Sequence, residues 1–153
     1  MSFWSLKDGA LLLPFRGRFV EPTGISLEKM NSFRKLNVYI KAKKLVKQVY
    51  TLLKKFPREE QYALCDQLRR AVISIPSNIA EGSGRQTEKD QAHFYTIAYG
   101  SLMEVLSQID VACDLGYISQ DEFDKLEILI DEEAKMLTGL VAKRTNAPLN
   151  SKQ

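Results

Sequence analysis

The sequence predicts an all-α protein, an antiparallel up-down-up-down bundle of four helices. From residue 32 onward, apolar residues recur every three or four positions in four long segments, as on one face of a helix. Residues that begin or end helices bound these segments, and the connections between them are short. Short connections place successive helices antiparallel.

The first predicted helix spans residues 33–56. One half of its helical wheel is apolar and comprises Tyr39, Ala42, Leu45, Val46, Val49, Tyr50, Leu52, Leu53 and Phe56. The other half carries Lys41, Lys43, Lys44, Lys47, Lys54 and Lys55. Leu36 and Ile40 fall on this lysine side, which indicates a second buried contact, as between subunits.

The second helix is predicted to begin at Pro57, a favoured first-turn residue, with Glu59 and Glu60 complementing the helix dipole. Its apolar stripe comprises Leu68, Val72, Ile75 and Ile79. Pro76 lacks the amide that would bond to the Val72 carbonyl, so the last turn should be bent or irregular. Gly82 and Gly84 supply the permissive backbone that ends a helix.

The third helix should start after Thr87, a plausible N-cap, and end at Gly116. Its predicted core line is Phe94, Ile97, Ser101, Val105, Gln108 and Ala112. Gly100 and Ser101 leave little side chain in mid-helix, which favours close approach of a neighbouring backbone.

The fourth helix opens at Ser119 with a capping box in which Ser119 and Glu122 satisfy each other's amides. Its predicted stripe is Phe123, Leu126, Ile130, Leu137 and Leu140 or Val141. Its solvent side is predicted to be acidic through Asp121, Glu122, Asp124, Glu127, Asp131, Glu132 and Glu133.

The predicted organisation is an irregular N-terminal extension at 1–31, the bundle at 32–144 and a tail at 145–153. The extension has scattered glycines and prolines and no sustained period. We favour Met30 as the true start of the protein, with a real, loosely ordered arm as the alternative. Cys65 lies on an apolar stripe and predicts a buried, reduced thiol. No apolar run reaches the length of a membrane span, and we expect a cytoplasmic protein.

Four blocks of sequence are similar to one known family. They are FRKLNVYIKAKKL (33–45), FPREEQYALCDQLRRAVISIPSNIAEGSGR (56–85), FYTIAYGSLMEVLSQIDVACDLGYIS (94–119) and EEAKMLTGLV (132–141). In this order and spacing they resemble the 23S rRNA intervening-sequence proteins, also called S23 ribosomal proteins. A related branch comprises the accessory variability proteins of diversity-generating retroelements, which bind a reverse transcriptase and nucleic acid. The resemblance implies a four-helix bundle that assembles into a homo-oligomer, with a five-membered ring favoured.

Charge is unevenly distributed along the chain. Residues 30–58 hold nine Lys or Arg and no Asp or Glu, whereas residues 59–153 hold nine basic and sixteen acidic residues. A basic helix face attracts phosphates in a salt-sensitive, largely sequence-independent manner. The alternative is an ordinary solvated lysine face, or one that meets an acidic helix of another subunit. The candidate phosphate-binding residues of this segment are Arg34, Lys35, Lys41, Lys44, Lys47 and Lys55.

Arg69, Arg70 and Arg85 form a second candidate group, because guanidinium groups suit phosphates as well as carboxylates. Asn78 and Glu81, beside Pro76, either bind a ligand or cap backbone groups, and we favour capping.

Enzymatic chemistry finds little support. His93 is the only histidine and has no partner at metal-ligand spacing, and no nucleotide-binding or nucleophile motif is present. We therefore expect no catalytic residues, metal or cofactor. The function predicted is a non-catalytic nucleic-acid-associated protein that binds RNA or DNA phosphates. The alternative is a protein-interaction scaffold, for example a partner of a reverse transcriptase.

Overall fold

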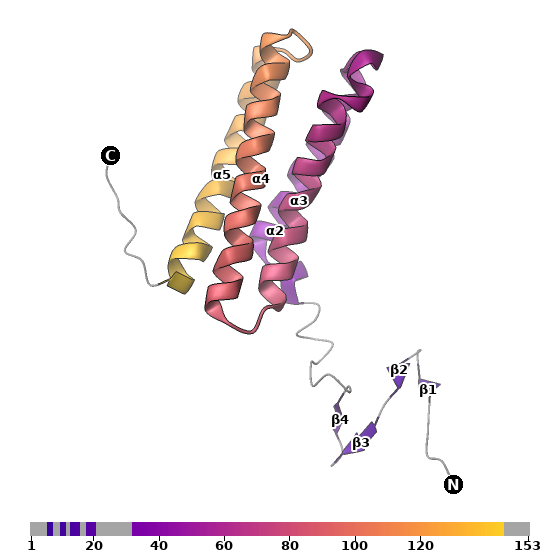
Figure 1. Ribbon diagram of the computed structural model, residues 1–153, viewed down its shortest axis with the longest axis vertical. Coiled ribbons are helices and arrows are strands. Elements are labelled where there is room, and N and C mark those ends of the chain that lie inside the picture. Colours follow the sequence, from indigo (N-terminus) through magenta and orange to yellow (C-terminus); the bar gives the residue numbers. More distant parts are fainter. Residues whose placement is uncertain (1–5, 8–9, 12, 16–17, 21–31, 146–153) are drawn as a thin grey trace. The chain divides into compact units, whose positions relative to one another are not determined.

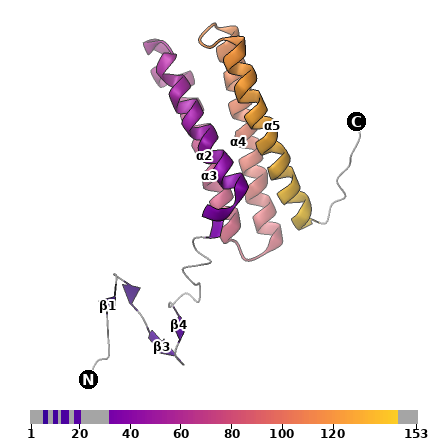
Figure 2. The ribbon, with the colours of Figure 1, turned by 180° about the vertical axis from the view of Figure 1, so that it is seen from behind.

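The structure, a computed structural model, describes residues 6–7, 10–11, 13–15, 18–20 and 32–145. Residues 32–145 are dominated by long helices that lie side by side (Figure 1) and are seen from behind in Figure 2. These are α2 (Asn37–Leu52), α3 (Leu64–Gly84), α4 (Glu88–Asp114) and α5 (Gln120–Thr145). Each helix packs against the one before it, and α5 closes the bundle by packing against α2. The all-α four-helix bundle predicted from the sequence is confirmed.

The chain divides into two units, Met1–Ser32 and Phe33–Gln153. In the first unit the described residues form two antiparallel ladders, β1 with β2 and β3 with β4. The strands are β1 (Leu6–Lys7), β2 (Ala10–Leu11), β3 (Leu13–Phe15) and β4 (Arg18–Val20). Met30, the predicted start, and residues 146–153 of the predicted tail lie outside the described residues. The start at Met30 stays a prediction.

The first two helices begin and end differently from the prediction. A 3-10 turn, η1 (Ser32–Lys35), precedes α2, and a second one, η2 (Leu53–Lys55), follows it. Pro57 leads into a third, η3 (Arg58–Tyr62), and Ala63 then leaves helical geometry with φ −116° and ψ −106°. The helix that was predicted to begin at Pro57 therefore begins at Leu64.

Pro76 lies inside α3 and is buried. The turn after Pro76 stays α-helical through Gly84, so it is not irregular, and a bend there stays a prediction. Two side chains next to the proline bond to helix carbonyls: the Ser77 hydroxyl donates to the Ile73 oxygen at 2.8 Å, and the Asn78 amide donates to the Ser74 oxygen at 2.8 Å. Neither bond reaches the Val72 carbonyl that Pro76 leaves without its amide, so the capping role favoured for Asn78 stays a prediction.

The core runs between all four helices. The predicted stripe of α3 is fully buried, as are five inward residues of α2: Val38, Ala42, Leu45, Val49 and Leu52. Each buried Val, Leu or Ile side chain among them contributes roughly 1.5–3 kcal/mol relative to an exposed position. None of the helices that the structure describes is long and apolar enough to cross a bilayer.

Three predicted faces need correction. In α2, Tyr50 of the predicted apolar half is 41% exposed, whereas Val38, which was not placed in that half, is buried. In α4, Phe94 and Gln108 are only partly buried and Ile97 is exposed, whereas the buried line is Ala92, Tyr95, Ala98, Ser101, Leu102, Val105, Ile109 and Ala112. A Cβ placed on Gly100 would meet no atom of the described residues within 4 Å, so Gly100 does not mediate the expected close approach. In α5, Glu133 is buried rather than on the acidic solvent side.

Candidate nucleic-acid interface

The lysines of α2 form an outward face opposite the core. Buried residues of α2 recur at spacings of four and three, so the intervening positions point to solvent. Lys43, Lys44 and Lys47 are exposed, and Lys41 is partly buried at the edge of α5. These lysines make one side of the bundle positively charged.

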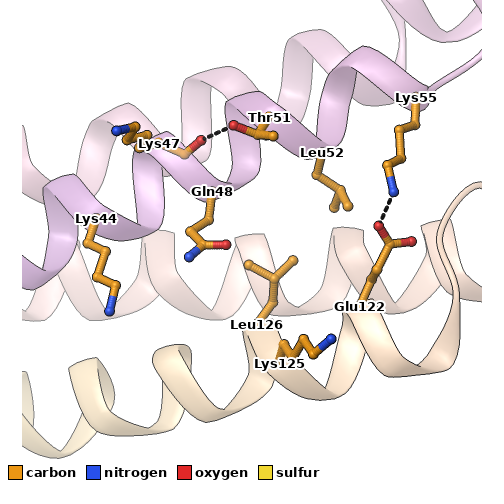
Figure 3. A pocket seen from close by; sticks show the side chains of 9 residues that line it. All are labelled: Lys44, Lys47, Gln48, Thr51, Leu52, Lys55, Glu122, Lys125 and Leu126. Atoms are coloured by element: carbon orange, nitrogen blue, oxygen red, sulfur yellow. Dashed lines mark hydrogen bonds and ion pairs between the residues drawn. The ribbon is translucent and has the colours of Figure 1, made fainter.

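A groove of about 600 Å³ lies where this face meets α5 (Figure 3). Four lysines and one carboxylate line it, together with polar and apolar side chains: Lys44, Lys47, Gln48, Thr51, Leu52, Lys55, Glu122, Lys125 and Leu126. Figure 3 shows Lys44 extending toward α5, and Leu52 and Leu126 pointing toward each other across the gap. The charge balance of the lining favours an anion.

Two of the candidate lysines are engaged in ion pairs between α2 or η2 and α5. Lys41 pairs with Glu132, and Lys55 pairs with Glu122. The hydrogen bond from Lys41 lowers the pKa of Glu132, and that from Lys55 lowers the pKa of Glu122. Pairing of helix-one lysines with helix-four carboxylates was expected between subunits, whereas the structure forms it inside one chain.

Lys44 and Lys47 are the groove lysines without such a partner. Neither forms an ion pair with any residue in the described part of the chain, whereas Lys125 is paired with Asp121 at 2.5 Å. A phosphate that enters the groove can therefore bind to the ammonium groups of Lys44 and Lys47 without breaking an existing ion pair.

Arg34 and Lys35 lie in η1, before the start of α2, and both are exposed. The Arg34 guanidinium lies 5.8 Å from the centroid of the Phe33 ring. Neither residue lines the groove, so the structure places them in a separate short helix that precedes α2 and not among the groove lysines.

The second candidate group does not line the groove either. Arg70 pairs with Asp66 at 2.6 Å, and Arg69 donates to the Gln61 carbonyl at 3.4 Å. Arg85 pairs with Glu81.

The Arg85 guanidinium also stacks over the Phe94 ring, 4.4 Å from its centroid. Arg85 thus joins the end of α3 to the start of α4, and the Glu81 carboxylate pairs with Arg85 instead of with the backbone groups that it was predicted to cap.

Lys125 is the groove residue that sequence reasoning missed. It follows Asp121 by one turn on the acidic fourth helix, so its local context gave no sign of a basic cluster. Only the register of α5 against α2, visible in the Lys55–Glu122 pair, brings it to the α2 lysines.

A solved structure has the same fold. It is the crystal structure of a protein of unknown function from the S23 ribosomal protein family of Bacteroides thetaiotaomicron. The two chains share 21% sequence identity with a TM-score of 0.63, and the match covers 68% of this chain and 97% of that one. No curated protein matches the chain.

Residues 34–139 match the sequence pattern of a protein family, and this stretch contains α2, α3, α4 and most of α5. The match extends over more than half of the chain. The chain belongs to the 23S rRNA-intervening sequence protein family.

Proposed function

We propose that this protein is a non-catalytic nucleic-acid-associated protein that binds RNA or DNA phosphates at the groove between α2 and α5. The observation that carries the proposal is the groove lining, in which four lysines face one carboxylate. Lys44 and Lys47 supply the primary contacts, because neither is held in an ion pair within the described residues. RNA is the first ligand to test, given the 23S rRNA in the family's description.

Binding of this kind depends on released counterions, so it weakens steeply with salt and shows little sequence preference. The other candidate residues contribute at longer range. Arg34 and Lys35 extend the positive surface along η1, and Arg69 adds positive charge on α3. Arg70 and Arg85 contribute less, because a phosphate must compete with Asp66 for Arg70 and with Glu81 for Arg85. A phosphate must compete with carboxylates for Lys41 and Lys55, which makes these two weaker contributors.

The test is a salt titration of affinity for single-stranded and structured RNA. The Lys44→Glu, Lys47→Glu double variant should lose most of its affinity, and its log–log salt slope should become shallower by about one for each phosphate that it no longer binds. Its control is the Lys89→Glu, Lys143→Glu double variant, which makes the same change in net charge at exposed positions away from the groove.

Equal losses in the two double variants would show that only net charge matters. No affinity at low salt in the wild-type protein would remove the proposal. Lys41 is left unchanged in this test, because its reversal would set two carboxylates against each other at the Glu132 pair.

The second candidate function is an interaction scaffold built by self-assembly, and an apolar groove on the outer side of α4 and α5 favours it. The groove measures about 430 Å³ and is lined by Tyr99, Met103, Leu106, Glu127, Ile128, Ile130, Asp131 and Ala134. Ile128 is 61% exposed there, and Ile40 on the lysine face of α2 is 49% exposed. We propose that Ile40 and the neighbouring lysines of α2 bind this groove, with its Glu127 and Asp131, on a second copy of the chain.

Such a contact joins different surfaces of the two copies and therefore closes into a ring if the rotation permits. The resemblance implies five members. Light scattering of Ile128→Lys, which adds a positive charge opposite lysines, should show smaller particles than wild type. The control, Leu115→Lys, changes another exposed apolar residue outside the groove and should leave the particle size unchanged. If the wild-type protein is monomeric at micromolar concentration, the self-assembly proposal is wrong. The groove would then bind a different protein, such as a reverse transcriptase.

A further inference from the structure

Glu133 is a charged residue type at a core position. It follows the inward stripe of α5, three residues after Ile130 and four before Leu137, and its side chain is 1% exposed. Neither carboxyl oxygen has a hydrogen-bond partner among the described residues. Buried carboxyl groups are ordinarily paired or hydrogen-bonded, so this one requires an explanation.

The packing around Glu133 offers one cation. Lys41 of α2, whose ammonium is bonded to the adjacent Glu132, acts on Glu133 from the edge of the seam between α2 and α5. Glu132 itself and Lys135 of α5 point outward and are exposed. Lys41 makes a negative charge on Glu133 less unfavourable, but its ammonium is already paired with the exposed carboxylate of Glu132.

The two other helices supply no charge at this level. The buried residues of α3 include one titratable group, Cys65, and those of α4 include one, Tyr95. The Tyr95 ring lies beneath Arg144 of α5. Arg144 is eleven residues, about 16 Å along α5, from Glu133. Tyr99 and Met103 of α4 line a groove with Ile130 and Ala134 of α5, so the half-buried phenol of Tyr99 lies near this level. Ser101, between them in the sequence, bonds to Ser74 of α3, and Cys65 is nine residues, about 13 Å, from Ser74 along α3.

An ionised carboxylate in such surroundings is far less stable than a neutral one, because it has neither water nor a hydrogen-bond donor. We propose that Glu133 makes the packing of α5 against α2 depend on a proton: the bundle closes over the neutral carboxyl and loosens at this seam when the carboxyl ionises. The proposal is independent of nucleic-acid binding.

The direction of the pH dependence follows from linkage. Burial raises the pKa of Glu133 from 4.5 to about 8, whereas the unfolded chain keeps the ordinary value. Between these two values the folded protein binds more protons than the unfolded chain, so stability falls as the pH rises. The contribution of the neutral carboxyl is complete below pH 4.5 and is lost as the pH passes through about 8.

The test is the melting temperature of the full chain from pH 5 to pH 9, compared among three proteins. We expect it to fall with pH in the wild type. Glu133→Gln, which keeps the shape of the neutral acid but cannot ionise, should remove most of that fall. The control is Asp110→Asn, the same kind of change at an exposed position of α4, whose melting temperature should fall with pH like that of the wild type.

A parallel fall in wild type and Glu133→Gln would overturn the proposal, as would a wild-type melting temperature that does not fall. If Glu133→Gln fails to fold, infrared spectroscopy of the wild type gives the answer. A carbonyl band of a protonated carboxylic acid at pH 6 that disappears by pH 9 supports the proposal, and its absence at pH 6 refutes it. Hydrogen exchange should locate the loss of protection in α2 and α5.

Discussion

The backbone of Gly82 on α3 lies against the aromatic ring of Tyr95 on α4. A Cβ placed on Gly82 would lie 2.9 Å from Cε1 of Tyr95 and 3.1 Å from Cβ of Phe94. Real Cβ atoms essentially never come within 3.0 Å of another atom, and Tyr95 is fully buried and cannot swing away. Gly82 is therefore needed for close packing of α3 on α4, and not only for ending α3.

Replacing Gly82 by alanine should destabilise the bundle. Overpacking a tight core site typically costs about 1–3 kcal/mol, which outweighs the ~1 kcal/mol that alanine gains over glycine in a helix. The control is Gly100→Ala in α4, where a Cβ meets nothing within 4 Å in the described residues. Urea unfolding should show Gly82→Ala less stable and Gly100→Ala as stable as wild type or more so. The reverse order would contradict the close approach.

The register of α4 was the part of the fold that the sequence predicted least well. The stripe of α3 was correct at Leu68, Val72, Ile75 and Ile79, because polar residues separate it cleanly from the solvent side. Apolar and aromatic residues instead surround α4 on nearly all sides, so several faces fit a helical period. Burial by the neighbouring helices, which no local pattern contains, selects the face with Leu102 and Ile109.

Two isoleucines of α4 test this register directly. Ile109 is 0% exposed and Ile97 is 38% exposed. Truncation of a buried isoleucine to alanine typically costs about 2–5 kcal/mol, because it removes apolar contact and leaves a cavity. Ile109→Ala should therefore lower the denaturation midpoint strongly, and Ile97→Ala should change it little. A larger loss in Ile97→Ala than in Ile109→Ala would restore the register predicted from the sequence.

The start of α5 offers a test of local capping. The Ser119 hydroxyl accepts from the Glu122 amide at 3.3 Å, and the Glu122 carboxylate accepts from the Ser119 amide at 3.1 Å, which confirms the predicted capping box. Ser119→Ala should cost about 1 kcal/mol. Ser107→Ala, at an exposed position inside α4, should have no cost, since alanine is the better helix former. Thermal unfolding of both variants checks this, and an equal effect would contradict the capping role.

The sequence predicted which charged residues belong to the candidate site but not which of them form ion pairs. The sequence identified the lysines of the first helix and the carboxylates of the fourth, yet the rotation of α5 about its axis decides which of them meet. That rotation pairs Lys41 with Glu132, brings Lys125 to the groove and turns Glu133 into the core. The sequence favours the solvent side for Glu133 because ionisable residues are seldom buried without a partner.

The Lys41–Glu132 pair predicts a pH dependence on the acid side. The hydrogen bond from Lys41 lowers the pKa of Glu132 below its ordinary 4.5. The stability contributed by this pair is thus present above about pH 4.5 and is lost as the pH falls through the lower, folded value. Between pH 5 and pH 3, Glu132→Gln should lose less stability than wild type, as measured by chemical denaturation at each pH. Identical losses would show that the exposed pair contributes nothing to folding, as many surface pairs do.

The two cysteines should differ in reactivity, because they differ in burial. Cys65 is 1% exposed, and burial raises the pKa of its thiol, so little of the reactive thiolate forms and reagents cannot reach it. Cys113 is only partly buried, near the end of α4. A thiol-specific disulfide reagent at pH 8 should label one thiol quickly in the native protein and the second only on unfolding. Cys113→Ser should abolish the fast reaction, and Cys65→Ala should leave it intact. Two fast thiols in the native protein would mean that α3 opens around Cys65 far more readily than its packing indicates.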